Sequence, residues 1–152
     1  MSETSRFFYV TFIRATPQRV WDAITQPEQT KLYWHGVQSI SDWKVGADWK
    51  LTFADGRVAD AGRVVEIDSP RRLVLEWRNE FLPDLKAEGF SRCLFEISEE
   101  NGVTRLAVTH EIDVERSKLI EAVSGGWPMI LSSLKSLLET GAPLGEVQDK
   151  TA

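Results

Sequence analysis

The chain has 152 residues, a formal net charge of −5, six tryptophans and one cysteine. A lone cysteine excludes an intrachain disulfide, and the acidic balance argues against nucleic acid or an anionic membrane as partner, because both bind basic surfaces. The length is typical of one domain, whose ordered core we expect at about 6–142, with a flexible tail at 143–152. Neither a signal-like start nor a long apolar run is present, so we expect a cytoplasmic protein without membrane insertion.

The first third of the chain predicts one strand followed by two short helices. Aromatic and β-branched residues indicate a strand at 7–14. Pro17 stands where the first residue of a helix is expected, and this helix should end near Gln26. Pro27 then begins a second short helix that ends at Gly36. Further strands are expected at 37–42, 48–53, 58–67 and 73–77.

The segment at 79–91 has no strand or helix periodicity, yet it contains the large apolar residues Phe81, Leu82, Leu85 and Phe90. It is long for a hairpin loop and too apolar for an ordinary solvent-exposed one. Exposed apolar loops commonly serve as lids or as contacts between proteins. We therefore expect this segment to be either a lid over a binding site or a contact in a homodimer.

The strongest local signal is Asn101-Gly102, which is typical of a two-residue hairpin loop between strands at 92–99 and 103–111. Such a loop places Cys93 opposite His110 and Phe95 opposite Val108, all on one apolar face. A four-residue loop would keep the faces and move each partner by two residues.

The closing helix is predicted to begin at Trp127-Pro128 and to end before Gly141. Residues 115–124, just before it, are expected to form only a loose helical turn. The apolar side chains of the helix fall within about 120° of the helical wheel, which indicates one buried face. This face comprises Trp127, Ile130, Leu131, Leu134, Leu137 and Leu138.

Several segments, in their order and spacing, resemble a single family. They are Ala-Thr-Pro-x-x-Val-Trp-Asp-Ala-Ile at 15–24, Trp-Lys-Val-Gly at 43–46, Leu-Val-Leu-x-Trp at 73–77, Thr-His-Glu at 109–111 and Gly-Trp-Pro at 126–128. From about residue 8 to residue 144 the chain resembles the activator-of-heat-shock-protein-90-ATPase-like family of the START-like, helix-grip (SRPBCC) superfamily. The resemblance implies an α+β fold, in which a curved antiparallel β-sheet wraps around a long C-terminal α-helix, with two short helices after the first strand and a cavity inside.

The resemblance implies several functions. Members of the superfamily include lipid and hormone carriers, polyketide aromatases/cyclases and a co-chaperone. We expect this chain to bind a small hydrophobic or amphipathic molecule, as a carrier or sensor with a stress-related role, rather than to be an enzyme. An aromatase/cyclase-like enzyme and a co-chaperone-type protein-interaction module are the alternatives. The chain has no room for the co-chaperone's second domain, which argues against a chaperone partner.

The predicted ligand site lies between the inner face of the sheet and the apolar face of the closing helix. No residue is assigned a catalytic role. The sequence has no nucleotide-binding motif, and its two histidines and one cysteine are not spaced to hold a metal, so we expect neither cofactor nor metal. The predicted cavity residues are Trp34, Arg63, Trp77, Cys93, Phe95, Val108, His110, Trp127, Leu131, Leu134 and Leu138.

Two features of this site have alternative interpretations. Cys93 and His110 would form a thiolate–imidazolium pair if they meet across the hairpin, but no third residue is evident to orient the imidazole, so we favour ordinary core residues. Arg63 faces the cavity with Val65 and Ile67 if their strand alternates regularly, and it would then bind a ligand carboxylate. A bulge in that strand would instead turn Arg63 toward solvent.

Overall fold

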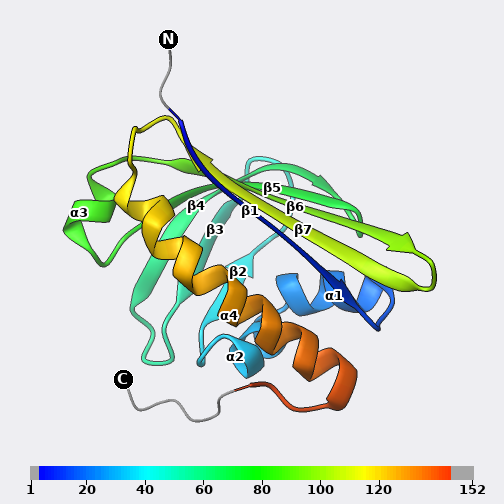
Figure 1. Ribbon diagram of the computed structural model, residues 1–152. Helices are drawn as coiled ribbons and strands as arrows, with labels where there is room; N and C mark the ends of the chain where they lie inside the picture. The colour runs from blue at the N-terminus through cyan, green and yellow to red at the C-terminus, as the bar shows by residue number, and fades with distance from the viewer. Residues whose placement is uncertain (1–3, 145–152) are drawn as a thin grey trace.

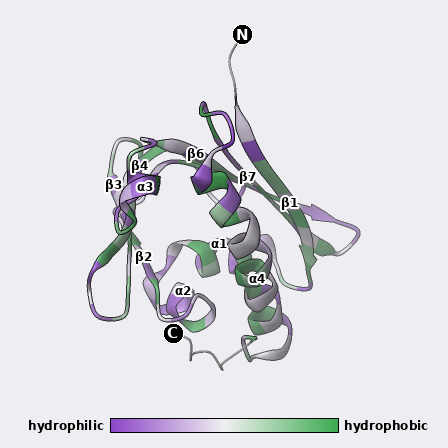
Figure 2. Ribbon diagram, turned by 60° about the vertical axis from the view of Figure 1, so that its left-hand side comes forward, coloured by the Kyte–Doolittle hydropathy of each residue, from purple (hydrophilic) through white to green (hydrophobic). Residues whose placement is uncertain are grey.

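The computed structural model describes residues 4–144, which form a seven-stranded antiparallel sheet with the long helix α4 lying across its inner face (Figure 1). The strand order is β1-β7-β6-β5-β4-β3-β2. The sheet curls over α4 and over the two short helices that follow β1 (Figure 2), so the predicted helix-grip fold is confirmed. The elements are β1 (Ser5–Ile13), α1 (Pro17–Thr25), α2 (Pro27–Tyr33), β2 (Gln38–Ser41), β3 (Asp48–Thr52), β4 (Val58–Asp68), β5 (Arg72–Asn79), α3 (Pro83–Lys86), β6 (Ser91–Glu100), β7 (Val103–Ile112) and α4 (Lys118–Thr140).

Two expectations concern the ends of the chain and the membrane. The predicted flexible tail at 143–152 lies outside the described residues from 145 onward. Among residues 4–144, no helix combines the length and apolar character that crossing a membrane requires.

The final hairpin has the register that the Asn101-Gly102 loop predicts. Cys93 pairs with His110, and Phe95 pairs with Val108. These four side chains are buried on the inner face, where they belong to or adjoin the main hydrophobic cluster. The two-residue loop therefore fixes both the faces and the partners.

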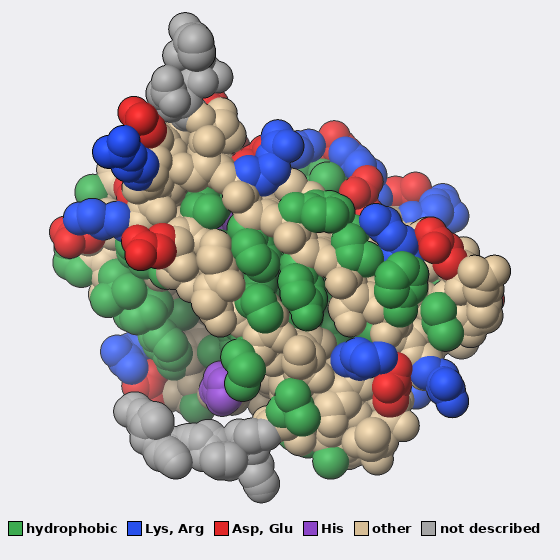
Figure 3. Space-filling view, in the orientation of Figure 1, with side chains coloured by type: hydrophobic (Ala, Val, Ile, Leu, Met, Phe, Trp, Pro, Cys, Tyr) green, Lys and Arg blue, Asp and Glu red, His purple; other side chains and the backbone are tan. Residues whose placement is uncertain are grey.

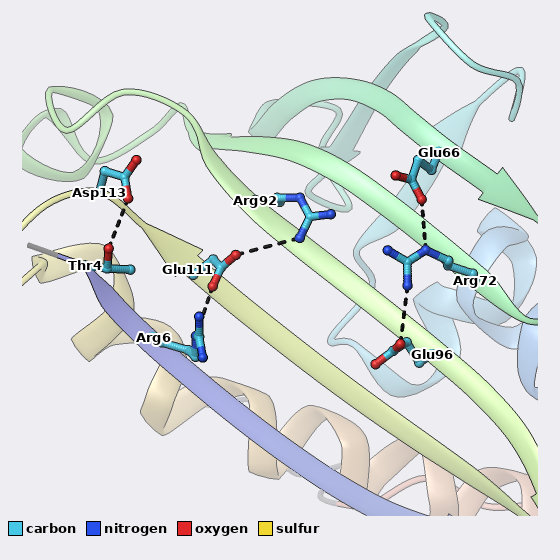
Figure 4. A network of polar contacts seen from close by, with 8 residues as sticks. All are labelled: Thr4, Arg6, Glu66, Arg72, Arg92, Glu96, Glu111 and Asp113. Atoms are coloured by element: carbon cyan, nitrogen blue, oxygen red, sulfur yellow. Dashed lines mark hydrogen bonds and ion pairs between the residues drawn. The ribbon is translucent and has the colours of Figure 1, made fainter. Parts of the chain in front are cut away.

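The outer face of the sheet carries a row of alternating charges across five strands. In register order the row is Arg6, Glu111, Arg92, Glu76 and Arg63. Figure 4 shows part of this row, in which the Glu111 carboxylate lies 2.9 Å from Arg6 Nε and 3.7 Å from Arg92 Nη1. On the face that the space-filling view shows, positive and negative side chains are likewise interspersed (Figure 3), as expected for a solvated surface.

The start of helix α4 corrects one prediction. The helix begins at Lys118, nine residues before the predicted start at Trp127, and Pro128 lies inside it. Ser117 caps the first turn by accepting a hydrogen bond from the Ile120 amide, and the first turn also buries Leu119 and Ile120 in a second hydrophobic cluster. Capping and burial therefore outweigh the unfavourable proline, whose cost is about 3 kcal/mol in a helix interior.

We expect Gly125→Ala to stabilise the protein by about 1 kcal/mol, because glycine is unfavourable inside a helix. Gly125 lies within α4, and a Cβ added there would meet no neighbouring atom within 4 Å. Urea denaturation followed by tryptophan fluorescence measures the change. Gly62→Ala is the matched control, because its Cβ would lie 1.8 Å from the Glu76 carbonyl oxygen and should destabilise the sheet. An unchanged or lowered midpoint for Gly125→Ala would contradict the prediction.

Candidate functional site

A small cavity lies between the inner face of the sheet and helices α2 and α4. Its volume is about 20 Å³, which is enough for one water molecule and far below the 300–1,000 Å³ of typical ligand pockets. Aromatic side chains fill most of the space that the fold encloses. The cavity is lined by Ile24, Tyr33, Trp34, Ser39, Trp43, Trp49, Leu51, Leu73, Leu75, Trp77, Phe95, Trp127, Ile130 and Leu131.

Three of the five tryptophans in this wall are anchored by their indole N–H groups. Trp49 Nε1 donates to Ser39 Oγ at 3.0 Å. Trp77 Nε1 donates to the Asp60 carboxylate at 3.0 Å, and Trp127 Nε1 donates to His110 Nδ1 at 3.2 Å. All three side chains are almost fully buried. Because each ring is fixed both by packing and by a directed hydrogen bond, these tryptophans form a rigid floor.

The other two tryptophans of the wall, Trp34 and Trp43, are only partly buried. No indole hydrogen bond of either ring occurs among the described residues. Trp34 is the C-cap residue that follows α2, and it precedes His35 and Gly36, both with positive φ. Trp43 itself has a φ of 54°. A positive φ is strained for a bulky residue and is found disproportionately at ligand-binding sites. These two rings are therefore the unanchored part of the wall.

His110 is a buried structural group rather than an acid–base catalyst. Its Nδ1 accepts from Trp127, so the ring is neutral with its proton on Nε2, which lies 2.8 Å from Ser91 Oγ. The Ser91 hydroxyl in turn donates to the Trp77 carbonyl at 2.8 Å. Burial lowers the pKa of His110 to about 3. Each polar atom in this series of hydrogen bonds thus has a partner, and the series links α4 to the sheet beside the cavity.

Asp60, on β4, is the second buried titratable group near the cavity. It is 8% exposed, and its carboxylate accepts the hydrogen bond from Trp77. Burial raises the pKa of Asp60 to about 7, and the nearby Glu80 charge adds to this effect, whereas hydrogen bonds from Trp77 and Asn79 oppose it. The carboxyl therefore changes its charge near neutral pH.

The structure brings about half of the predicted site residues to the cavity. Trp34, Trp77, Phe95, Trp127 and Leu131 lie in its wall. The others, apart from Arg63, are buried in the core around the cavity without lining it; they are Cys93, Val108, His110, Leu134 and Leu138.

The thiolate–imidazolium alternative has no support in the geometry. Cys93 and His110 are cross-strand partners, but both ring nitrogens of His110 are engaged by Ser91 and Trp127. Complete burial raises the pKa of the Cys93 thiol, so it is a poor nucleophile. Both residues are core residues, as favoured from the sequence.

Arg63 does not reach the cavity, which corrects its place in the predicted site. Its side chain is 61% exposed and lies 4.0 Å from Glu76 on the outer face. The register of β4 against β5 shifts between Val64 and Glu66, so Val65 is an extra residue. Val64 is buried whereas Val65 is 39% exposed. The bulge reverses the alternation and turns Arg63 toward solvent.

Sequence reasoning missed several wall residues on β3 and in the preceding turn. Trp49 and Leu51 alternate with charged residues in the strand pattern, and this signal could have placed both on the inner face. Trp43 gave no such signal, because a tryptophan with positive φ breaks the usual rule for turn residues. Asp60 was missed because a buried carboxyl is rare.

Comparison with known proteins gives one family and many related structures. The model of the family described as Activator of Hsp90 ATPase homolog 1-like protein matches residues 14–139. None of the curated proteins matches the chain.

Three solved structures illustrate the shared fold. The Aha1 dimer from Colwellia psychrerythraea has a TM-score of 0.73 at 18% identity, covering 90% of this chain and 98% of that one. CalU16 from Micromonospora echinospora has a TM-score of 0.73 at 24% identity, covering 94% of this chain and 79% of that one. An Hsp90 activator from Plasmodium falciparum has a TM-score of 0.65 at 22% identity, covering 80% and 86%. At these identities the likeness concerns the fold alone.

Proposed function

We propose, from the premise that this chain belongs to the Activator of Hsp90 ATPase homolog 1-like family, that it binds a small hydrophobic or amphipathic molecule between α4 and the sheet. The ligand is flat and aromatic, and the protein serves as its carrier or sensor in the cytoplasm. The observation that carries the proposal is the contrast between three anchored tryptophans and two unanchored ones around a single cavity.

The cavity of about 20 Å³ is too small for such a ligand, and an outward turn of Trp34 would enlarge it. Its ring centroid lies 5.5 Å from that of Trp127 and 6.4 Å from that of Trp77. If Trp34 turns outward, it leaves a space of indole size bordered by these two fixed rings, whose planes lie at 68° to each other. A flat aromatic molecule would replace the stacked contact with Trp77 and the tilted contact with Trp127, and such aromatic pairs are each worth about 0.5–1.5 kcal/mol beyond area burial. The protein thus exchanges its own side chain for the ligand.

The alternatives have less support in the geometry. An aromatase/cyclase-like enzyme needs titratable groups in the cavity. Among the residues that line the cavity, Tyr33 alone has a titratable side chain. The Tyr33 hydroxyl already donates to the Ala23 carbonyl, and burial raises its pKa. The Plasmodium relative is described as an Hsp90 activator, but the present site is an internal cavity rather than a broad docking surface.

A homodimer is a secondary part of the proposal, and the Colwellia relative is described as a dimer. The segment at 79–91 carries the exposed side chains Phe81, Leu82 and Phe90. The segment is not a free lid, because near its C-terminal end the Glu88 carboxylate accepts hydrogen bonds from the Ser117 hydroxyl at 2.6 Å and the Lys118 amide at 2.8 Å. A fixed apolar surface of this kind suits contact with a second copy.

The proposal is tested by titrating the ¹⁵N-labelled protein with naphthalene and following the tryptophan indole N–H signals. We expect the Trp34 and Trp43 signals to shift strongly, while the anchored tryptophans keep their hydrogen-bonded positions. Leu131→Phe, which fills the cavity, should abolish the shifts. Met129→Phe on the exposed face of the same helix is the matched control and should leave them unchanged. Absence of any saturable shift in the native protein would refute the proposal.

A further inference from the structure

Asp60 is the one acidic side chain that is buried among the described residues, and no buried lysine or arginine accompanies it. Its carboxylate forms no ion pair within the described part of the chain. Buried carboxylates are normally paired with a cation because an uncompensated charge is costly in a low dielectric. Burial raises the pKa of Asp60 to about 7, so the carboxyl is neutral at lower pH, and above this pH its charge has no cationic partner among the described residues.

Trp77 connects this carboxyl to the cavity. Its indole N–H donates to Asp60, while its ring lines the cavity and packs against Trp34, Trp49 and Trp127 at centroid distances of 6.4, 4.6 and 5.6 Å. A carboxylate that accepts from the indole N–H adds negative potential to a ring face that is already electron-rich. Several tryptophan faces around one cavity are the arrangement that holds ammonium groups by cation–π contact.

We propose that the ligand is an organic cation, an aromatic or alkyl ammonium, whose positive charge lies over Trp77 within the field of Asp60. The inference rests on the function proposed above and narrows its ligand from any flat aromatic molecule to a positively charged one. Binding would supply the counter-charge that Asp60 lacks in the free protein. Asp60 acts through Trp77, so it is a positioning and electrostatic residue.

The charged groups around Asp60 do not supply this counter-charge. Glu80, which follows β5, is acidic, and its carboxylate is itself bound by Arg78 at 2.7 Å and Lys86 at 3.1 Å. His110, on β7, is neutral because burial lowers its pKa to about 3. The register partner of Asp60 on β3 is Leu51, and no ion pair reaches it from the described part of α4. Above pH 7, where Asp60 is ionised, a cation in the cavity would therefore meet one unshared negative charge.

The inference is tested with two probes of equal shape, phenyltrimethylammonium and the neutral tert-butylbenzene, by titrating the ¹⁵N-labelled full chain at pH 8. We expect the native protein to bind the cation at least tenfold more tightly than the neutral probe. Asp60→Asn, which keeps an acceptor for the Trp77 indole, should weaken cation binding about tenfold and leave neutral binding unchanged. A second test uses the native protein alone. Its affinity for the cation should rise between pH 6 and pH 8 as Asp60 ionises, whereas its affinity for the neutral probe should stay constant.

The outcomes separate this inference from the proposed function. Equal or tighter binding of tert-butylbenzene would overturn the inference and leave the binding function standing. A cation preference that persists in Asp60→Asn, or that does not change with pH, would overturn the role of Asp60. Failure of both probes and of naphthalene to bind the native protein would refute the binding function itself. The hydrogen-bonded Trp77 indole signal shows in each case whether the variant is folded.

Discussion

Asp60→Asn is expected to lose roughly 3 kcal/mol in its free energy of unfolding, relative to the native protein, as the pH falls from 6.5 to about 4. The reason is that Asp60 and His110 oppose each other. Burial raises the pKa of Asp60 to about 7 and lowers that of His110 to about 3. When one of the two groups is removed, the pH dependence of stability that the other group causes is no longer cancelled.

The sign for each group follows from which state binds more protons. Between pH 3 and 6.5 the unfolded chain protonates His110 while the folded protein does not, so stability falls as the pH falls. Between pH 3.8 and 7 the folded protein keeps Asp60 protonated while the unfolded chain does not, so stability falls as the pH rises. Where the windows overlap, two slopes of about 1.4 kcal/mol per pH unit cancel.

Urea denaturation at a series of pH values measures these slopes. His110→Gln is the complementary variant, and its stability should rise as the pH falls from 7 to 4, because Asp60 then titrates alone. Comparing each variant with the native protein at the same pH cancels the surface carboxyls, such as Glu66, whose pKa is lowered by a hydrogen bond from Arg72. Parallel profiles for the native protein and Asp60→Asn would show that Asp60 ionises normally.

Local chemistry made much of the fold predictable. Pro17 at the first helical position and the Asn101-Gly102 loop each restrict a few residues strongly, and the helix α1 and the last hairpin begin and pair where these residues indicate. The inner face of that hairpin then followed from strict alternation. Such elements need no information from distant parts of the chain.

The predictions that were wrong concern features that depend on tertiary contacts. Helix α4 begins early because Leu119 and Ile120 are buried against Leu85 and Ile112, residues that the local pattern does not connect. Arg63 points outward because one extra residue, Val65, enters β4. A bulge leaves no unambiguous mark in a strand of mixed polarity, so the wrong register of alternation could not be detected from the sequence.

The location of the candidate site was predictable from the sequence, but the filling of its cavity by aromatic side chains was not. Placing Trp34, Trp77 and Trp127 between the sheet and the last helix follows from the fold. That these rings fill the cavity follows from their rotamers and from partners such as Asp60, which the sequence does not reveal. The structure thus adds the knowledge of which tryptophans are anchored by a hydrogen bond and which are not.

The anchored and unanchored tryptophans are expected to respond very differently to truncation. Trp127→Ala should cost about 3–5 kcal/mol, because it opens a cavity in the core and leaves His110 Nδ1 without its donor. Trp34→Ala should cost only about 1–2 kcal/mol, because its ring is partly exposed and no indole hydrogen bond is lost. Urea denaturation of the two variants measures the contrast.

Trp34→Ala should also create an open slot that binds free indole, since the replaced ring and the probe have the same shape. Millimolar indole is then expected to restore about 1 kcal/mol of stability to this variant, because a ligand that binds only the folded state raises the free energy of unfolding. Met129→Ala on the exposed face of α4 is the control and should gain nothing. If Trp34→Ala costs as much as Trp127→Ala, or gains nothing from indole, Trp34 is a fixed part of the core. The cavity would then have no movable wall, and the exchange of a side chain for a ligand would lose its physical basis.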